Sequence, residues 1–155
     1  MPIFATESLY EALGGFEGVE GLAHAWHVRV LNDDVVSHAF SHGFHPDHTV
    51  RLATYWAEVL GGPERYGDSY GTESDVVRLH SGNGEHSEMD SRAIECFKEA
   101  LVDVGFDRDE RLATALIDYF VWTTAHTFTR YTSSKDDVPD NLIMPHWSYD
   151  GLVEE

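Results

Sequence analysis

The chain has 155 residues, of which 42% are hydrophobic and 25% charged, as expected for one globular domain with a full core. Ten Lys and Arg against 28 Asp and Glu give a net charge of −18, which repels phosphate backbones and anionic lipids and excludes nucleic-acid and membrane-surface functions. The single cysteine excludes an intramolecular disulfide framework, a cysteine-rich zinc site and an iron–sulfur cluster. We expect a cytoplasmic protein, because no apolar run approaches the ~20 residues of a membrane span and no basic-then-apolar signal opens the chain.

The spacing of apolar residues predicts an all-α fold without convincing strands. The predicted helical segments, in chain order, are 8–13, 18–31, 35–40, 47–60, 87–104 and 109–132. Residues 64–88 are rich in Gly, Ser and Asp and are predicted to form a loop, apart from an apolar patch at 76–80. The tail, residues 138–149, is punctuated by proline and carries apolar anchors, so we expect it to lie along the surface of the domain.

Histidines are abundant, with ten in the chain and six of them between His24 and His48. Four of these six have the three- and four-residue spacing that could place imidazoles on one face of a helix, as metal ligands require: His38, His42, His45 and His48. Gly43 and Pro46 would break that helix, so the alternative is a set of solvated or capping histidines on a corner loop.

His80 follows an apolar run and opens a glycine-containing loop. A histidine in this position is usually a core or capping residue, but a single neutral imidazole is also the usual axial ligand of haem iron. Large aromatic residues gather in the two helices and the corner that also carry His27 and His48, which suits a pocket for an apolar ligand with one reactive point. These aromatic residues are Trp26, Phe40, Phe44, Tyr55 and Trp56.

An ordered set of short motifs runs from Leu9 to Thr132: Leu9-Tyr10-Glu11-Ala12-Leu13-Gly14-Gly15, Arg29-Val30-Leu31-Asn32-Asp33, Phe40, Tyr55-Trp56-Ala57-Glu58-Val59-Leu60-Gly61-Gly62-Pro63-Glu64-Arg65-Tyr66 and Val77-Arg78-Leu79-His80. In this order and at these separations the chain resembles the truncated haemoglobins, which have a two-over-two helical version of the globin fold, and is most similar to group II. The resemblance implies a single domain over residues 1–155, with a globin core at 9–132 and a C-terminal tail at 133–155.

The resemblance also implies haem b as cofactor, with His80 as the proximal iron ligand. The other residues that it places against haem are Phe40, His48, Leu52, Trp56, Tyr66 and Arg78, the last two as partners of the propionates. The residues that it places around a bound ligand are Trp26, His27, Phe40, His48, Leu52, Tyr55 and Ala93. His27 stands where the family usually has a tyrosine, and Ala93 where group II usually has a tryptophan. His27 and His48 are therefore the distal candidates, and no residue is assigned a certain catalytic role.

A haem protein of this kind is expected to bind dioxygen, carbon monoxide and nitric oxide. Oxygen transport, nitric oxide detoxification and peroxidase-like turnover would use the same residues, so whether the protein is an oxidoreductase stays open. Coordination of iron by His27 or His48, a reductase partner with a basic face, and a monomer or a homodimer are further open expectations. Two other interpretations remain: a non-haem metal-binding protein built on the histidine cluster, and a globin-like module that has lost haem.

Overall fold

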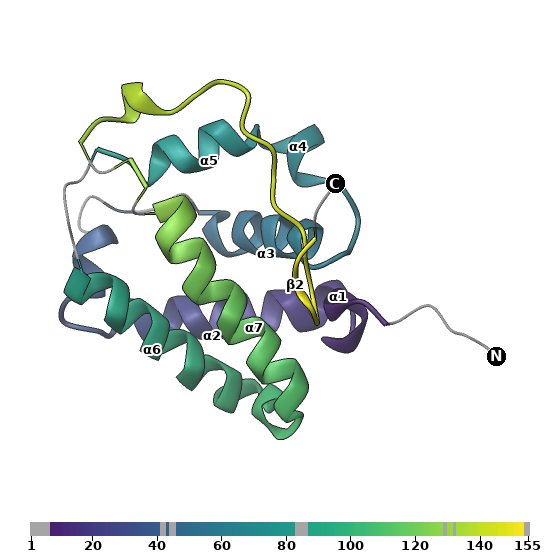
Figure 1. Cartoon of the computed structure of the whole chain (residues 1–155). Coiled ribbons are helices and arrows are strands. Elements are labelled where there is room, and N and C mark those ends of the chain that lie inside the picture. Colours follow the sequence, from purple (N-terminus) through teal and green to yellow (C-terminus); the bar gives the residue numbers. More distant parts are fainter. Residues whose placement is uncertain are drawn as a thin grey trace.

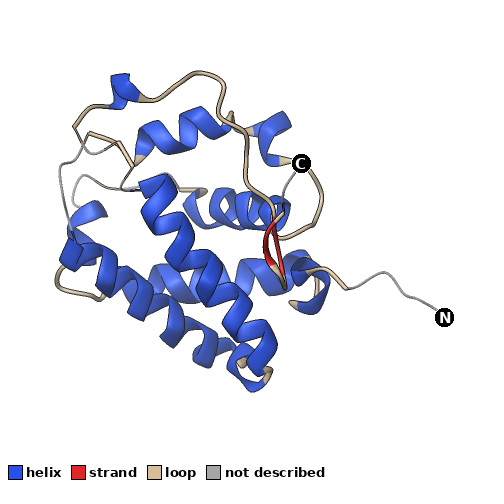
Figure 2. Ribbon diagram, viewed as in Figure 1, coloured by secondary structure: helices blue, strands red, loops and turns tan. Residues whose placement is uncertain are grey.

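The computed structural model describes residues 7–40, 43, 46–82, 87–128, 130–131 and 133–153. Its helical elements are α1 (Leu9–Ala12), α2 (Phe16–Leu31), the 3₁₀ helix η1 (Val36–Phe40), α3 (His48–Val59), α4 (Tyr66–Ser69), α5 (Glu73–Leu79), α6 (Ser87–Val104), η2 (Phe106–Arg108), α7 (Glu110–Thr123), the π-helical turn η3 (Thr124–Phe128) and η4 (Lys135–Asp137). Within the described residues, strand occurs as β1 (Trp147–Ser148) and β2 (Gly151–Leu152) (Figure 2). The prediction of an all-α chain is confirmed.

Four long helices form the core in two layers. α2 packs against both α3 and α6, and α6 packs against α7 (Figure 1). Aromatic rings fill the space between them: Trp56 meets Phe97 edge to face at 5.7 Å, and Phe97 stacks on Phe120 at 4.4 Å. Trp26 lies against Phe120 at 5.7 Å and so connects α2 to the same cluster. The two-over-two arrangement expected from the sequence is confirmed.

Short sequence signals explain where the smaller helices begin and end. A capping box formed by Ser8 and Glu11 starts α1, and the positive φ angles of Gly14 (92°) and Gly15 (81°) turn the chain into α2. α5 starts in the same way, with a second capping box between Thr72 and Asp75. This box fixes the first turn of the helix that ends at His80.

The prediction of a loop between residues 64 and 88 was wrong, because this stretch contains α4 and α5. Glycine, serine and aspartate lower helix propensity, but the Thr72–Asp75 capping box and tertiary packing outweigh them. The helix predicted over 109–132 also ends early. α7 gives way to the π-turn η3, where the Thr124 hydroxyl donates to the Phe120 carbonyl at 2.7 Å, a side-chain bond that competes with the helical ladder.

The C-terminal tail crosses the surface of the domain as expected, and one of its side chains is also buried in the core. In Figure 1 it arches over α5 and then descends to the β1–β2 hairpin beside α7. Trp147 is buried in that hairpin, and its indole N–H donates to the Ala115 carbonyl at 3.1 Å. None of the helices in the described part of the chain is long and apolar enough to cross a membrane.

Candidate functional site

α3 and α5 run in opposite directions and bring two histidines to the same end of the pair. At one end, the Tyr55 hydroxyl of α3 donates to the Glu73 carboxylate of α5 at 2.7 Å. At the other end, His48 is the first residue of α3 and His80 caps the C-terminus of α5. The two imidazoles are close enough for His80 to lower the pKa of His48. Tyr55 is seven positions after His48, and His80 is seven positions after Glu73, so the two separations match at about two helical turns each.

The His80 side chain is oriented as in a histidine that coordinates a metal. It follows the last residue of α5, and its Nδ1 lies 2.8 Å from the Val76 carbonyl one turn earlier. Because a carbonyl only accepts, this contact assigns the proton to Nδ1 and the lone pair to Nε2. His80 is an exposed residue, and Nε2 is the nitrogen whose lone pair could coordinate a metal.

Three rings from three different elements meet on the other side of the site. His27 of α2, Phe40 at the end of η1 and His48 of α3 form a triangle, with centroid distances of 4.5 Å (His27–His48), 5.2 Å (His27–Phe40) and 5.3 Å (Phe40–His48). The Thr49 hydroxyl lies 3.3 Å from Nδ1 of His27 and holds this ring from the side. The cluster joins an apolar face to two imidazoles, as expected for the distal wall of a small-ligand site.

Both distal imidazoles are neutral at pH 7. Burial lowers the pKa of His27, and the neighbouring His24 lowers it further. Burial also lowers the pKa of His48 to about 4, with further contributions from His27 and His80. A neutral imidazole offers one N–H donor and one lone pair, so each ring can either donate to a ligand or coordinate a metal.

Trp26 and Ala93 are in contact through a hydrogen bond that was not predicted from the sequence. The indole N–H of Trp26 donates to the Ala93 carbonyl on α6 at 3.1 Å. The ring also meets Trp56 edge to face at 6.0 Å. Trp56 is 3% exposed and belongs to the aromatic core. Leu52 is half-buried on α3, one turn after His48.

Tyr55, Tyr66 and Arg78 make contacts other than those expected. Tyr55 is bonded to Glu73 at the far end of α3, and Tyr66 lies against Tyr55 at 5.3 Å. The Arg78 guanidinium is bound by the C-terminal tail, through the Val138 carbonyl and the Asp140 carboxylate. In this structure, the guanidinium expected for the haem propionates is thus directed to the tail.

The histidine cluster considered from the sequence does not assemble into a metal site among the described residues. His42 and His45 lie outside them, as does Phe44 of the predicted aromatic set, while His38 is exposed and His48 joins His27 and Phe40 instead. Within the part of the chain that the structure describes, no group of three or more His, Cys, Asp and Glu side chains could hold a metal ion.

Sequence reasoning missed Glu73, a buried carboxyl at the start of α5. Its side chain is bonded to Tyr55, and burial raises its pKa to about 7, helped by the nearby Glu58. The capping box at Thr72 was a signal that a helix starts here. No local pattern shows that the residue after the cap points inward.

The side chains fit a haem whose iron is held by one imidazole. His80 offers Nε2 while its other nitrogen is fixed by a backbone carbonyl, which is how metal-ligating histidines are usually oriented. The ring cluster across from it is apolar enough to cover a porphyrin face and contains two neutral nitrogen bases. A dedicated non-haem metal site needs three or four protein ligands. In the described part of this site, His80 alone has its second ring nitrogen fixed by a backbone carbonyl.

Comparisons with known proteins agree with this fold. The family model described as "Bacterial-like globin" matches residues 8–126. A group 1 truncated haemoglobin from Synechocystis is 31% identical over 81 residues, and the match covers 51% of this chain and 65% of that protein. A thermostable haemoglobin structure from Thermobifida fusca has a TM-score of 0.67 at 22% identity, covering 80% of this chain and 98% of its own.

A group II truncated haemoglobin structure from Bacillus anthracis gives the same result. Its TM-score is 0.67 at 16% identity, over 81% of this chain and 94% of its own. The similar structures are therefore matched over nearly their whole length, while about a fifth of this chain lies outside the shared fold. The family match ends at residue 126, before the tail that covers α5.

Proposed function

The chain belongs to the bacterial-like globin family, and on that premise we propose that it holds haem b through Nε2 of His80 and binds dioxygen and other diatomic ligands. One observation carries the proposal. His80, whose imidazole is oriented by a backbone carbonyl, lies at the same end of the α3–α5 pair as two neutral imidazoles from other helices. When bound, haem would supply an iron that can take a diatomic ligand, and His80 would hold that iron.

The residues of this chain then have separate tasks. The Val76 carbonyl accepts the Nδ1 proton of His80, which fixes the ring and makes Nε2 a better donor. On the distal side, an N–H of His27 or His48 can donate to a ligand that carries partial negative charge, with a contribution of about 1 kcal/mol. Phe40 packs against both imidazoles and covers part of their surface.

We extend the proposal to redox chemistry on the same residues. The lone pair of a neutral imidazole, His27 or His48, can take up a proton transiently and return it during peroxide or nitric oxide chemistry; burial lowers the pKa of both rings, so each returns the proton readily. Turnover of this kind needs an electron donor. The net charge of −18 favours a cytoplasmic reductase with a basic face as that partner.

Absorption spectra of the ferric, reduced and carbon-monoxide-bound protein test the haem assignment. We expect a Soret band that shifts with carbon monoxide, and loss of haem retention in His80→Ala. His126→Ala is a matched control, because the exposed His126 makes the same contact one turn back, from Nδ1 to the Trp122 carbonyl at 2.9 Å. This variant should retain haem.

Two results would contradict the proposal. Absence of a Soret band after addition of hemin would indicate a globin-like module without haem. Equal haem retention in His80→Ala and the unchanged protein would show that another residue ligates the iron. The reduced spectrum also separates an open iron from one coordinated by His27 or His48, and substitution of each histidine in turn identifies which ring coordinates it.

A further inference from the structure

α5 is too short to determine its own position. It has seven residues, fewer than the ~12–15 that an isolated helix needs in water. Its inner face is buried through Glu73, Val76 and Val77. The placement of His80, which follows directly on this helix, therefore depends on what contacts α5 from the outside.

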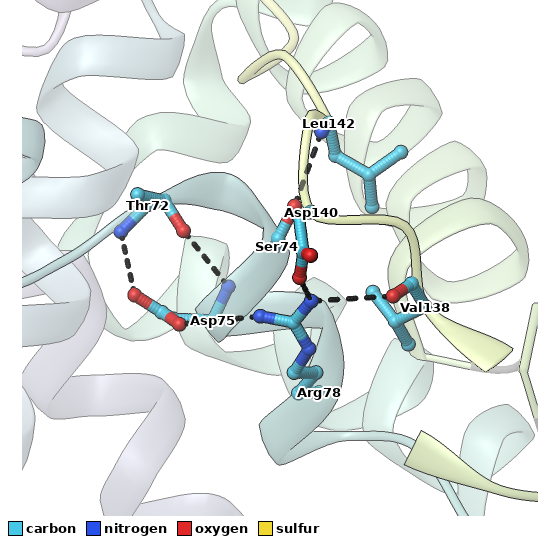
Figure 3. A network of polar contacts seen from close by, with 7 residues as sticks. All are labelled: Thr72, Ser74, Asp75, Arg78, Val138, Asp140 and Leu142. Atoms are coloured by element: carbon cyan, nitrogen blue, oxygen red, sulfur yellow. Dashed lines mark hydrogen bonds and ion pairs between the residues drawn. The ribbon is translucent and has the colours of Figure 1, made fainter. Parts of the chain in front are cut away.

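The C-terminal tail contacts the outer face of α5 at two successive turns and then contacts the chain just beyond the end of the helix. We call residues 133–142 the strap. The Leu142 N–H donates to the Ser74 hydroxyl at 3.1 Å, and the Arg78 guanidinium donates to the Val138 carbonyl at 3.2 Å (Figure 3). Arg78 also pairs with Asp140. Just before the strap, the carbonyl of residue 131 accepts the N–H of residue 82, at 2.9 Å. The two segments run antiparallel.

The spacing of these contacts places them opposite His80. Ser74 and Arg78 are four residues apart, so they lie on one line along the surface of α5. His80 caps the C-terminus of this helix two residues after Arg78, which corresponds to about 200° of rotation. Its ring is bonded to the Val76 carbonyl, on the side of the helix away from that line. The strap therefore contacts the side of α5 that faces away from the imidazole.

Two features show that these contacts are built into the fold. Ser74 is 0% exposed, so its hydroxyl is enclosed where it meets the Leu142 N–H. Gly82 has a φ of +77°, and a Cβ at this position would lie 3.2 Å from the backbone nitrogen of Lys135. Glycine thus permits both the backbone turn and the close approach of the strap.

The strap is fixed beyond this contact as well. Downstream, the indole of Trp147 donates to the Ala115 carbonyl on α7 and packs against Tyr119 at 5.7 Å and Trp122 at 5.5 Å. Ser74 is 68 residues from Leu142 and Arg78 is 62 residues from Asp140, so these bonds tie distant parts of the chain together. A segment anchored on α7 thus holds α5 from outside.

We propose that residues 133–142 act as a strap that restrains α5 and sets the orientation of His80, with Ser74 and Arg78 as positioning residues. The part concerning His80 rests on the proposed function, whereas the restraint of α5 does not. The strap lies outside the family match at residues 8–126.

The test uses the full-length double variant Ser74→Ala/Asp140→Asn, which leaves Arg78 and His80 unchanged. The matched control is Ser91→Ala/Asp137→Asn, which makes the same two chemical changes at exposed positions on α6 and in the strap. We expect amide hydrogens of α5 to exchange at least about tenfold faster in the first variant and unchanged in the control. In the haem-loaded protein we expect a shifted iron–histidine stretching band in the ferrous resonance Raman spectrum and faster transfer of hemin to an acceptor apoglobin.

The readouts separate the two proposals. Unchanged α5 exchange in the double variant would overturn the strap, whether or not the protein binds haem. Faster exchange with an unchanged iron–histidine band would overturn the link to His80. Failure of the unchanged protein to take up hemin would overturn the proposed function, and with it that link, while the exchange rates would still decide whether the strap restrains α5.

Discussion

Replacement of Glu73 by Gln should stabilise the protein, and more so as the pH rises. Glu73 is 7% exposed, and burial raises its pKa from 4.5 to about 7. The folded state therefore disfavours the carboxylate, so the stability that Glu73 contributes at low pH is lost as the pH rises through 7. The glutamine side chain keeps an oxygen that can accept from the Tyr55 hydroxyl but cannot ionise.

The size of the effect follows from the two pKa values. The pKa of Glu73 is 4.5 in the unfolded chain and about 7 in the folded protein. This difference lowers the free energy of unfolding of the unchanged protein by about 1.4 kcal/mol at about pH 5.5 and by about 3.4 kcal/mol at about pH 8.5. The advantage of Glu73→Gln in free energy of unfolding should thus grow by about 2 kcal/mol across this range. Any difference in packing between Glu and Gln is the same at both pH values and cancels.

Urea unfolding of both proteins at the two pH values, at equal haem content, measures this difference. Glu64→Gln makes the same chemical change at an exposed position after α3 and should show no such growth. An advantage of Glu73→Gln that stays constant with pH, parallel to the control, would refute the assignment of a buried carboxyl with a raised pKa that is bonded to Tyr55.

Three further predictions concern the site and the charge. Trp26→Phe removes the indole bond to the Ala93 carbonyl and should lower the free energy of unfolding by about 1 kcal/mol or more; an unchanged urea midpoint would contradict this. In the haem-free protein, the His48 imidazole should stay neutral down to about pH 5 by NMR, because its pKa is about 4. The stability that it contributes above pH 6.5 should be lost as the pH falls through 4. The melting temperature should rise with added NaCl, since salt screens the repulsion within a chain of net charge −18; a flat response would count against this.

The long helices were predictable because their apolar spacing and end signals agree. The segment predicted at 47–60 is observed as His48–Val59, and the one at 87–104 is observed at Ser87–Val104. α4 and α5 were missed because their composition resembles that of a loop, and because α5 makes contacts with a segment far along the chain. A helix held by a strap 62 to 68 residues further along the chain leaves no local periodic signal.

Part of the site was predictable as well, and the part that was missed depends on contacts between distant segments. The sequence named His27, Phe40 and His48, and the structure brings these rings together. The assignment of His80 to haem iron stays a prediction until it is measured. The buried bond between Tyr55 and Glu73 and the contact of Arg78 with the tail depend on how separate helices approach each other.

The position of the strap at the C-terminal end of the described chain has a consequence for the order of folding during synthesis. α2, α3, α6 and α7 all leave the ribosome before residues 133–142, and the contacts of α2 with α3 and α6, and of α6 with α7, form among these helices themselves. Ser74 and Arg78 must wait for partners 68 and 62 residues further on, which makes their bonds slow to close. The nascent protein should therefore reach a packed globin core first and complete the surroundings of His80 last, so that tight capture of a cofactor would follow translation.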